Sequence, residues 1–359
     1  MSTQPTTAQT LPTAPPPPRP SYRVTVAGRD ITPLVNTRLV ELTLTDNRGF
    51  EADQLDLTLD DSDGALDLPP RGAEIRLYLG WAGSALEDKG SYTVDEVESS
   101  GAPDKMTLRA RSADLRKGLT TKREQSWHQT TLGAILRTIA QRNALTAVIG
   151  SVFDAAAIAH IDQTDESDVN FLTRLAQEYD GIAAVKADRL LFIPAGRGST
   201  ASGRALDPVT ITRQSGDSHR FAVADRNAYT GVRAYWHDTR TGRKEEVIVG
   251  TDEAPEAPTP TEPSAGNLKT LRHTYASKRN AETASKAEWQ RLQRGVAEFS
   301  ITLAKGRPEL IPELAVQVRG FKPQIDAAEW IIIRITHTLA YTGLTTALEL
   351  EVLTRDLSV

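Results

Sequence analysis

The strongest constraint on the fold is a series of short segments, between Tyr22 and about Arg111, in which every second residue is apolar. Alternating apolar side chains put one face of a pleated strand against a core and leave the other face polar. Turn residues, notably Asp61-Ser62-Asp63-Gly64, separate the segments. Short strands at this spacing predict an antiparallel β-barrel or sandwich. The predicted strands include residues 22–26, 39–44, 55–59, 75–79 and 106–108.

The apolar period changes to that of a helix after the two threonines at positions 130 and 131. Leu132, Ile135, Leu136, Ile139 and Ala140 follow at i, i+3, i+4, i+7 and i+8. This spacing gives an amphipathic helix, and either threonine is a suitable N-cap.

A second helix is predicted from Asp168 to Tyr179, with Ser167 or Asp168 as its cap and Gly181 just past its end. Residues 183–186 and 189–193 then flank Ala187-Asp188 and predict a small hairpin. Together with the preceding helix, these segments predict a small α+β unit.

Two proline-rich stretches interrupt this order. Residues 1–20 end in a run of prolines and predict a disordered or docking arm, and residues 251–266 predict a linker or long surface loop. After the linker, residues from Tyr275 to about Val296 predict a helix with small inward residues, and strands return at 314–318, 330–335 and 348–352. We therefore expect an arm at 1–20, a first β-barrel domain at 21–117, a small α+β insertion at 118–200 and a second β-barrel domain at 201–359. The second domain would contain the linker at 251–266 and a helix at about 275–296.

The end of the first β-region can be aligned with the end of the chain. Residues 75–79 correspond to 314–318, and Leu108 corresponds to Leu348. Between them, Tyr92, Val94 and Val97 correspond to Trp330, Ile332 and Ile335. Duplication explains the match, and chance similarity between alternating strands is the alternative. With duplication, the fold class is α+β and mainly β: two related antiparallel β-barrel domains, an inserted small α+β unit and a helical segment.

Composition excludes several classes of function. The chain has no cysteine, which removes disulfides, thiolate metal sites and thiol nucleophiles together. Its net charge of -5 offers no broad cationic field for nucleic acid, and no apolar run approaches the length of a membrane span. The N-terminus does not resemble a secretory signal, so we expect synthesis and folding in the cytoplasm.

A search for catalytic, cofactor-binding or metal-binding residues yields none. No two histidines stand at helical or strand spacing for a shared metal, so a cluster would need long-range convergence. His337 lies beside apolar neighbours in a repeat strand, where we expect a packed or interfacial imidazole. Residues 60–64 lack the ligand positions of a calcium loop and predict a turn. The carboxylate pairs at 95 and 96 and at 349 and 351 have the residue types of a glycosidase but lie along predicted strands.

Two segments are similar to the phage late control protein D family, the tail hub proteins of contractile-tailed phages and related injection particles. Residues 165–181, DESDVNFLTRLAQEYDG, resemble the family's helix, and residues 306–310, 330–337 and 341–346 resemble its closing strands. One departure is Asp180-Gly181, where the family more often has glycine first.

The resemblance implies a non-enzymatic structural hub, a homotrimeric ring that joins the tail tube to a spike. It also implies contacts with tape-measure and baseplate wedge proteins, and a location in the baseplate of a virion or tail-like particle. Interface residues are not assigned by the sequence. The alternatives are a tail-associated enzyme that degrades the cell envelope and a carbohydrate-binding module, for which the dispersed tryptophans are the candidate contacts.

Overall fold

The computed structural model of the chain describes residues 18–70, 72–112, 118–186, 188–198, 204, 206–223, 229–238, 240–250, 267–295 and 297–353. The predicted linker at 251–266 lies outside these residues, as does nearly all of the predicted arm at 1–20. Pro20, the last residue of that arm, is the first residue of strand β1. No helix in the described part of the chain has the length and apolar character needed to cross a membrane.

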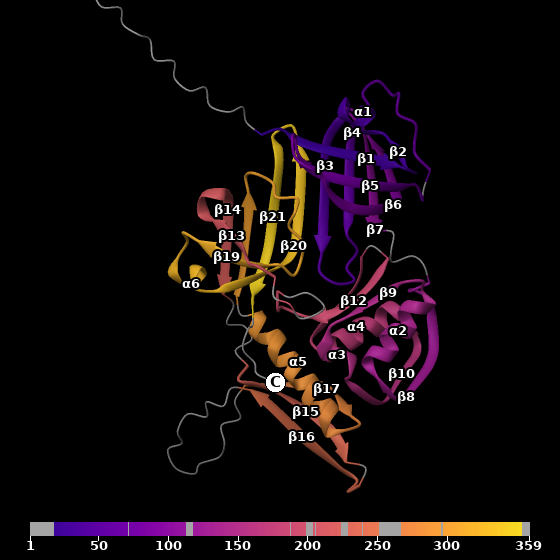
Figure 1. Ribbon diagram of the computed structural model, residues 1–359, viewed down its shortest axis with the longest axis vertical. Helices are drawn as coiled ribbons and strands as arrows, with labels where there is room; N and C mark the ends of the chain where they lie inside the picture. Colours follow the sequence, from indigo (N-terminus) through magenta and orange to yellow (C-terminus); the bar gives the residue numbers. More distant parts are fainter. Residues whose placement is uncertain are drawn as a thin grey trace, which may run out of the picture.

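Thirteen strands of the described residues form one sheet that contains both predicted β-regions (Figure 1). The mainly β class with two related β-regions is therefore confirmed. Hydrogen bonding between the described strands closes neither region separately into a barrel, so we call them the first and second β-units. The elements of the first β-unit are β1 (Pro20–Val26), β2 (Arg29–Asp30), α1 (Thr32–Asn36), β3 (Leu39–Asn47), β4 (Gln54–Asp60), β5 (Glu74–Trp81), β6 (Glu87–Ser100) and β7 (Lys105–Ser112). Those of the second are β13 (Val209–Thr212), a 3-10 turn (Arg213–Ser215), β14 (Gly216–Val223), β18 (Ala297–Leu303), β19 (Ala315–Arg319), α6 (Pro323–Asp326), β20 (Glu329–Ala340) and β21 (Gly343–Val352).

Each β-unit has its own core on one face of the shared sheet. The alternating residues Leu42, Leu44, Leu55 and Leu57 are buried in the first core, which also takes in Leu339 from the second unit. The second core is built around aromatic and branched side chains from β18, β20 and β21. The period-two pattern of the sequence thus sets which face of each strand is buried.

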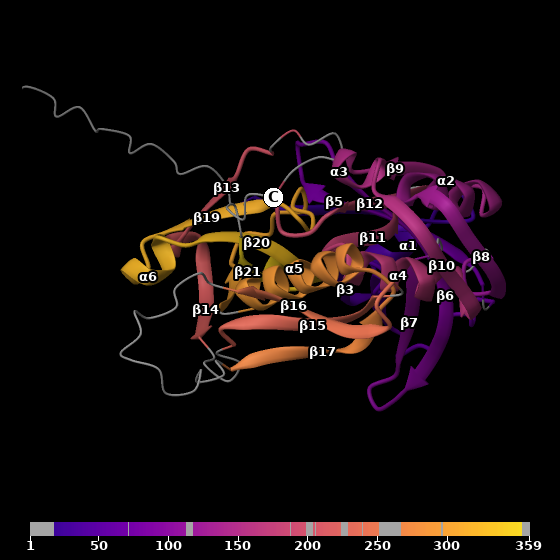
Figure 2. The same cartoon turned by 90° about the horizontal axis from the view of Figure 1, so that it is seen from below.

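The elements of the inserted α+β unit lie together at the right of Figure 2, and their apolar side chains form a third core. Thr131 caps α2 by accepting a hydrogen bond from the backbone N–H of Ala134, and Ser167 caps α4 in the same way through Asn170. Strands β11 and β12 form the predicted hairpin, although Ala187 is outside the described residues. The elements are β8 (Lys122–Thr131), α2 (Leu132–Arg142), β9 (Thr146–Ile149), α3 (Ser151–Asp154), β10 (Ala157–Ser167), α4 (Asp168–Glu178), β11 (Gly181–Lys186) and β12 (Arg189–Pro194).

A further three-stranded sheet, which the sequence patterns do not predict, precedes and supports the last long helix. It contains β15 (Gly231–Asp238), β16 (Arg243–Gly250) and β17 (Leu268–Tyr275), and α5 (Lys278–Arg294) follows. The predicted helix start at Tyr275 is wrong, because this residue ends β17 and Ser277 caps the helix. The small inward residues Ala281, Ala284 and Ala287 are buried, as the pattern of the helix indicates. In Figure 1 this sheet and the α+β unit lie beyond the same end of the two β-units.

The internal repeat extends to the register of the strands. In the first β-unit, Val94 pairs with Ala110 and Val97 pairs with Leu108, with an irregularity between Val94 and Glu96. In the second, Ile332 pairs with Leu350 and Ile335 pairs with Leu348, with an irregularity between Ile332 and Arg334. Every pair between β6 and β7 thus has its counterpart between β20 and β21. A bulge at the same position in both copies is strong evidence for duplication, because bulges are specific local features.

A second shared irregularity supports the same conclusion. It lies between Leu39 and Glu41 where β3 pairs with β4, and between Gly216 and Ser218 where β14 pairs with β18. One part of the predicted alignment is wrong by two residues, because it matched Ile75 to Leu314. Ile75 faces Tyr92, and the residue that faces Trp330, the counterpart of Tyr92, is Val316. The units also differ at their edges, because β1 runs antiparallel to β5 whereas β13 runs parallel to β19.

Candidate functional site

The two β-units meet at a strand pair that we call the seam. Strand β20 pairs with β19 near its beginning, passes its bulge, and then pairs with β3 from Arg334 to Ala340. Across the seam, Ile335 faces Asp46, Thr336 faces Thr45 and His337 faces Leu44. The backbone hydrogen bonds of the two units are therefore continuous through this pair (Figure 1).

Polar side chains reinforce the seam on both sides. The guanidinium of Arg334 donates to Asn47 Oδ1 at 2.8 Å and lies 3.2 Å from Glu51. Lys89 Nζ donates to the carbonyl of Pro308 at 3.0 Å. Burial lowers the pKa of this lysine. A buried ammonium that depends on backbone carbonyls of the other β-unit opposes separation of the two units.

The repeat leaves two strand edges without the partner that its other copy has. Strand β14, the counterpart of β3, pairs with β18 but with no other described strand. Strand β6, the counterpart of β20, pairs with β5 only as far as Thr93, so from Glu96 to Ser100 one edge has no pairing strand among the described residues. Val223 at the end of β14 is 60% exposed. Unpaired edges of this kind are templates for pairing with another chain.

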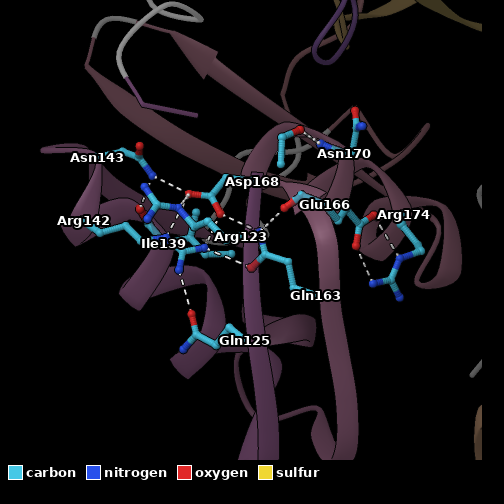
Figure 3. A network of polar contacts seen from close by, with 11 residues as sticks. Arg123, Gln125, Ile139, Arg142, Asn143, Gln163, Glu166, Asp168, Asn170 and Arg174 are labelled. Atoms are coloured by element: carbon cyan, nitrogen blue, oxygen red, sulfur yellow. Dashed lines mark hydrogen bonds and ion pairs between the residues drawn. The ribbon is translucent and has the colours of Figure 1, made fainter. Parts of the chain in front are cut away.

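The segment that carries the family resemblance builds a buried charge network (Figure 3). Asp168, the first residue of α4, is fully buried, and its carboxylate forms an ion pair with Arg142 at the end of α2. It also accepts hydrogen bonds from Asn143 at 2.9 Å and from Gln163 at 2.8 Å. The network joins both helices to β10, and its donors already saturate the carboxylate. The network therefore holds the two helices and β10 together, and no lone pair of the Asp168 carboxylate remains directed at a cleft.

A second buried network joins the α+β unit to both β-units. Asp180 makes a two-point ion pair with Arg294 at the end of α5, and Arg294 also lies 3.4 Å from Glu351 of β21. Arg48, from the turn after β3, contacts Glu351 and Glu313. Burial raises the pKa of Glu313, and the guanidinium of Arg48 offsets part of this rise. The left-handed backbone after α4 falls on Asp180, with φ of 50°, and not on Gly181 as the pattern suggests.

A third contact fixes the α+β hairpin to the first β-unit. Lys186 Nζ donates to Asp46 at 2.6 Å and to Asp53 at 2.7 Å. Burial raises the pKa of the Asp53 carboxyl to about 6, although Lys186 opposes the shift. The two carboxylates in turn raise the pKa of Lys186. The two shifts have different causes: burial raises the pKa of Asp53, whereas the two carboxylates raise the pKa of Lys186 against the effect of burial.

The carboxylates considered for catalysis are engaged in ion pairs. Glu96 lies 2.7 Å from Arg109, and Glu349 lies 3.6 Å from Arg334. These are equivalent cross-strand pairs of the two repeats with their charges exchanged. Residues 60–64 form the predicted turn, in which the backbone N–H of Ser62 donates to Asp60.

The histidines divide into buried and exposed cases. His337 is buried at the seam, where its Nδ1 lies 2.8 Å from the hydroxyl of Thr346. Two histidines, His128 and His160, come together on neighbouring strands of the α+β unit. Sequence spacing could not reveal this, because residues 128 and 160 belong to different strands that pair only in the folded chain.

The arrangement of these units is a fold found in phage tail proteins. The tail protein of Neisseria meningitidis MC58 matches with a TM-score of 0.67 over 93% of this chain and 96% of that chain, at 14% identity. The chain belongs to the phage tail baseplate hub (GPD) family, whose model matches residues 39–342. Two relatives described as probable baseplate hub proteins, from Escherichia phages 186 and P2, are 47% and 48% identical over 94% of this chain and 94% of their own length. The protein is thus a baseplate hub protein of a phage tail, as the resemblance implies.

Proposed function

We propose that the hub acts as a ring of three chains in which the seam inside each chain is repeated between chains. Strand β14 of one chain would pair with the free edge of β6 of the next, as β3 pairs with β20 within the chain. Three chains would then place six related β-units around one axis. The observation that carries the proposal is the shared register of the repeats, which leaves one unpaired edge of each kind.

The repeat specifies the register of this contact. Within the chain, Ile335 faces Asp46 and Thr336 faces Thr45. By the repeat, Val97 and Glu98 of β6 are equivalent to Ile335 and Thr336, and Val223 and Ala222 of β14 are equivalent to Asp46 and Thr45. The same register between chains therefore places Val97 opposite Val223 and Glu98 opposite Ala222. Val97 is half-buried against the first core and Val223 is exposed in a single chain. Pairing would therefore cover apolar surface as well as the backbone groups of two edges, and both effects favour association.

Disulfide formation tests the register in a chain that has no cysteine of its own. Directly opposed residues in an antiparallel pair have Cα atoms about 4.5–5.5 Å apart, within the range of a disulfide. The double variant Glu98→Cys/Ala222→Cys should give covalent trimers after mild oxidation. The matched control, Glu98→Cys/Val223→Cys, moves one thiol to the opposite face of its strand and should remain uncrosslinked.

Native mass measurement tests the trimeric ring separately from the β14–β6 contact between its chains. A native trimer in which neither cysteine pair crosslinks would retain the ring and reject this seam. A stable folded monomer at micromolar concentration would reject the ring itself.

We further infer that the ring joins a sixfold tail tube to a threefold spike, with tape-measure and wedge proteins as further neighbours, and that it assembles in the bacterial cytoplasm. The α+β unit and the β15–β17 sheet lie beyond one end of the β-units, so the two ends of the ring would differ (Figure 1). The end formed by the β-units would present six related contacts, and the other end three copies of the additional units. Electron microscopy of the hub bound to a purified spike would test this polarity; a spike seated at the β-unit end would reverse it.

No chemical step is required for this role, and the ion pairs of the candidate carboxylates support a structural function. The expected activity on purified peptidoglycan is therefore none. Turnover that is abolished by Glu349→Gln, but not by Glu298→Gln on the neighbouring strand, would favour the enzyme instead.

A further inference from the structure

A cleft of 610 Å³ lies between the α+β unit and the β15–β17 sheet with its helix, and the hub function does not account for it. Its walls are β10 and α4 on one side and β17 and α5 on the other. Helices α4 and α5 lie side by side in both views of the chain (Figures 1 and 2). At their C-terminal ends, Arg291 donates to the carbonyl of Gln177 at 2.8 Å, and Arg294 pairs with Asp180. These contacts join the two walls of the cleft.

One carboxylate that lines the cleft has no counter-ion. Glu178, the last residue of α4, accepts no hydrogen bond and makes no ion pair among the described residues. Burial raises the pKa of this carboxyl, and the charges of Arg174 and His273 offset only part of the rise. A carboxylate withdrawn from water without a hydrogen-bonded cation costs free energy, and a cation that reached it would offset that cost.

The basic side chains around the cleft are engaged by other carboxylates. Arg174 lies 2.7 Å from Glu166. Arg291 pairs with Glu288, and Lys269 lies 2.6 Å from the same carboxylate. None of these three cations is left for the carboxylate at the end of α4. A cation that completes the charge balance of the cleft therefore has to come from outside it.

An aromatic ring lines the cleft near this carboxylate. Burial raises the pKa of the Tyr275 phenol to about 12, with smaller contributions from Glu178 and Glu288, so the ring stays neutral within electrostatic range of both. A guanidinium group forms two parallel hydrogen bonds with a carboxylate and stacks on the face of an aromatic ring. We propose that the cleft receives an arginine side chain of a partner protein, with Glu178 as its counter-ion and Tyr275 as the ring on which it stacks.

The rest of the lining suits a peptide around that arginine. Thr173, Gln177 and Asn280 bring hydroxyl and amide groups that bond to a peptide backbone, and Ile161 and Leu271 add apolar surface. A bound segment would contact α4 and β17 together, and so hold the α+β unit against the β15–β17 sheet. This inference is independent of the ring.

Two blocked tripeptides, acetyl-Gly-Arg-Gly-amide and acetyl-Gly-citrulline-Gly-amide, test the site on the full-length protein. Citrulline has the shape of arginine without its charge. Saturation-transfer NMR, which detects weak ligands of large proteins, should show binding of the arginine peptide and binding of the citrulline peptide that is weaker by about tenfold or more. Equal binding of the two peptides, or no binding of the arginine peptide, would reject the proposal. This comparison does not depend on the folding of any variant.

Substitutions locate the bound peptide. Glu178→Gln keeps the size of the side chain and should weaken binding of the arginine peptide by about tenfold or more. Glu124→Gln, which removes an exposed carboxylate of the same unit, is the matched control and should leave binding unchanged. Unchanged binding in Glu178→Gln would contradict the assignment of the counter-ion. Arg355→Gln removes an arginine from the last residues of the chain itself and should also have no effect; stronger peptide binding in this variant would make that segment the occupant in place of a partner.

Discussion

Replacement of His337 by glutamine tests the electrostatics of the seam. This imidazole is fully buried between β3 and β21, and its Nε2 has no hydrogen-bond partner among the described residues. Burial, with a smaller contribution from the ammonium of Lys89, lowers the pKa of His337 to about 3. The folded protein therefore holds this side chain neutral over the whole range in which a free histidine titrates.

The direction in which pH changes the stability follows from the protonation of the imidazole in the folded and in the unfolded chain. Above pH of about 6.5 the imidazole is neutral in both the folded and the unfolded chain, and its contribution to stability is fully present. As the pH falls below that value, the unfolded chain binds a proton that the folded chain excludes, so stability is lost progressively towards pH 3. Each pH unit corresponds to 1.36 kcal/mol, so the loss at pH 5.0 is about 2 kcal/mol.

Urea unfolding at pH 7.5 and pH 5.0 measures this loss. The free energy of unfolding of wild type should fall between the two pH values by about 2 kcal/mol more than that of His337→Gln. Any constant cost of the substitution cancels in the comparison. His237→Gln, which removes an exposed imidazole, should retain the wild-type pH dependence. If wild type and His337→Gln lose the same stability, the buried neutral imidazole is not the source of the effect.

Two further substitutions address packing and buried charge. Asp168→Ala leaves the partly buried Arg142 without its carboxylate and should destabilise the α+β unit by about 3–5 kcal/mol, measured by urea unfolding. Asp165→Asn, which removes an exposed ion pair of the same motif, should change stability by less than about 1 kcal/mol; equal effects would contradict a structural role for the network. Ala281→Leu should overfill the packing of α5 against its neighbours and cost about 1–3 kcal/mol in thermal unfolding. Lys286→Leu, on the exposed side of the same helix, is its control, and a similar loss there would point to helix propensity instead.

Local patterns in the sequence predict most individual elements because each depends on neighbouring residues. Alternating leucines mark β3 and β4, and the threonine and serine caps mark the starts of α2 and α4. The repeat is also visible in the sequence, since Val97 and Ile335 or Leu108 and Leu348 occupy equivalent core positions. The same signal fails for β15 to β17, whose outward faces carry charged and aromatic side chains in place of clean alternation.

The sequence by itself determined the mainly β class and the inserted α+β unit, and it suggested the duplication that the shared strand register supports. Only the tertiary structure decided which edges meet. Strand β20 pairs with β19 as far as Ile331 and with β3 from Arg334 onward, and no pattern within either strand encodes that partner. The contact of His128 with His160 and the ion pair of Asp180 with Arg294 likewise join residues far apart in the chain. Periodicity records which face of a strand or helix is buried, whereas partners and charge pairs arise when distant segments are brought together. The family resemblance implies the ring, whereas the proposed pairing of β14 with β6 between chains follows from the edges that the folded chain leaves unpaired.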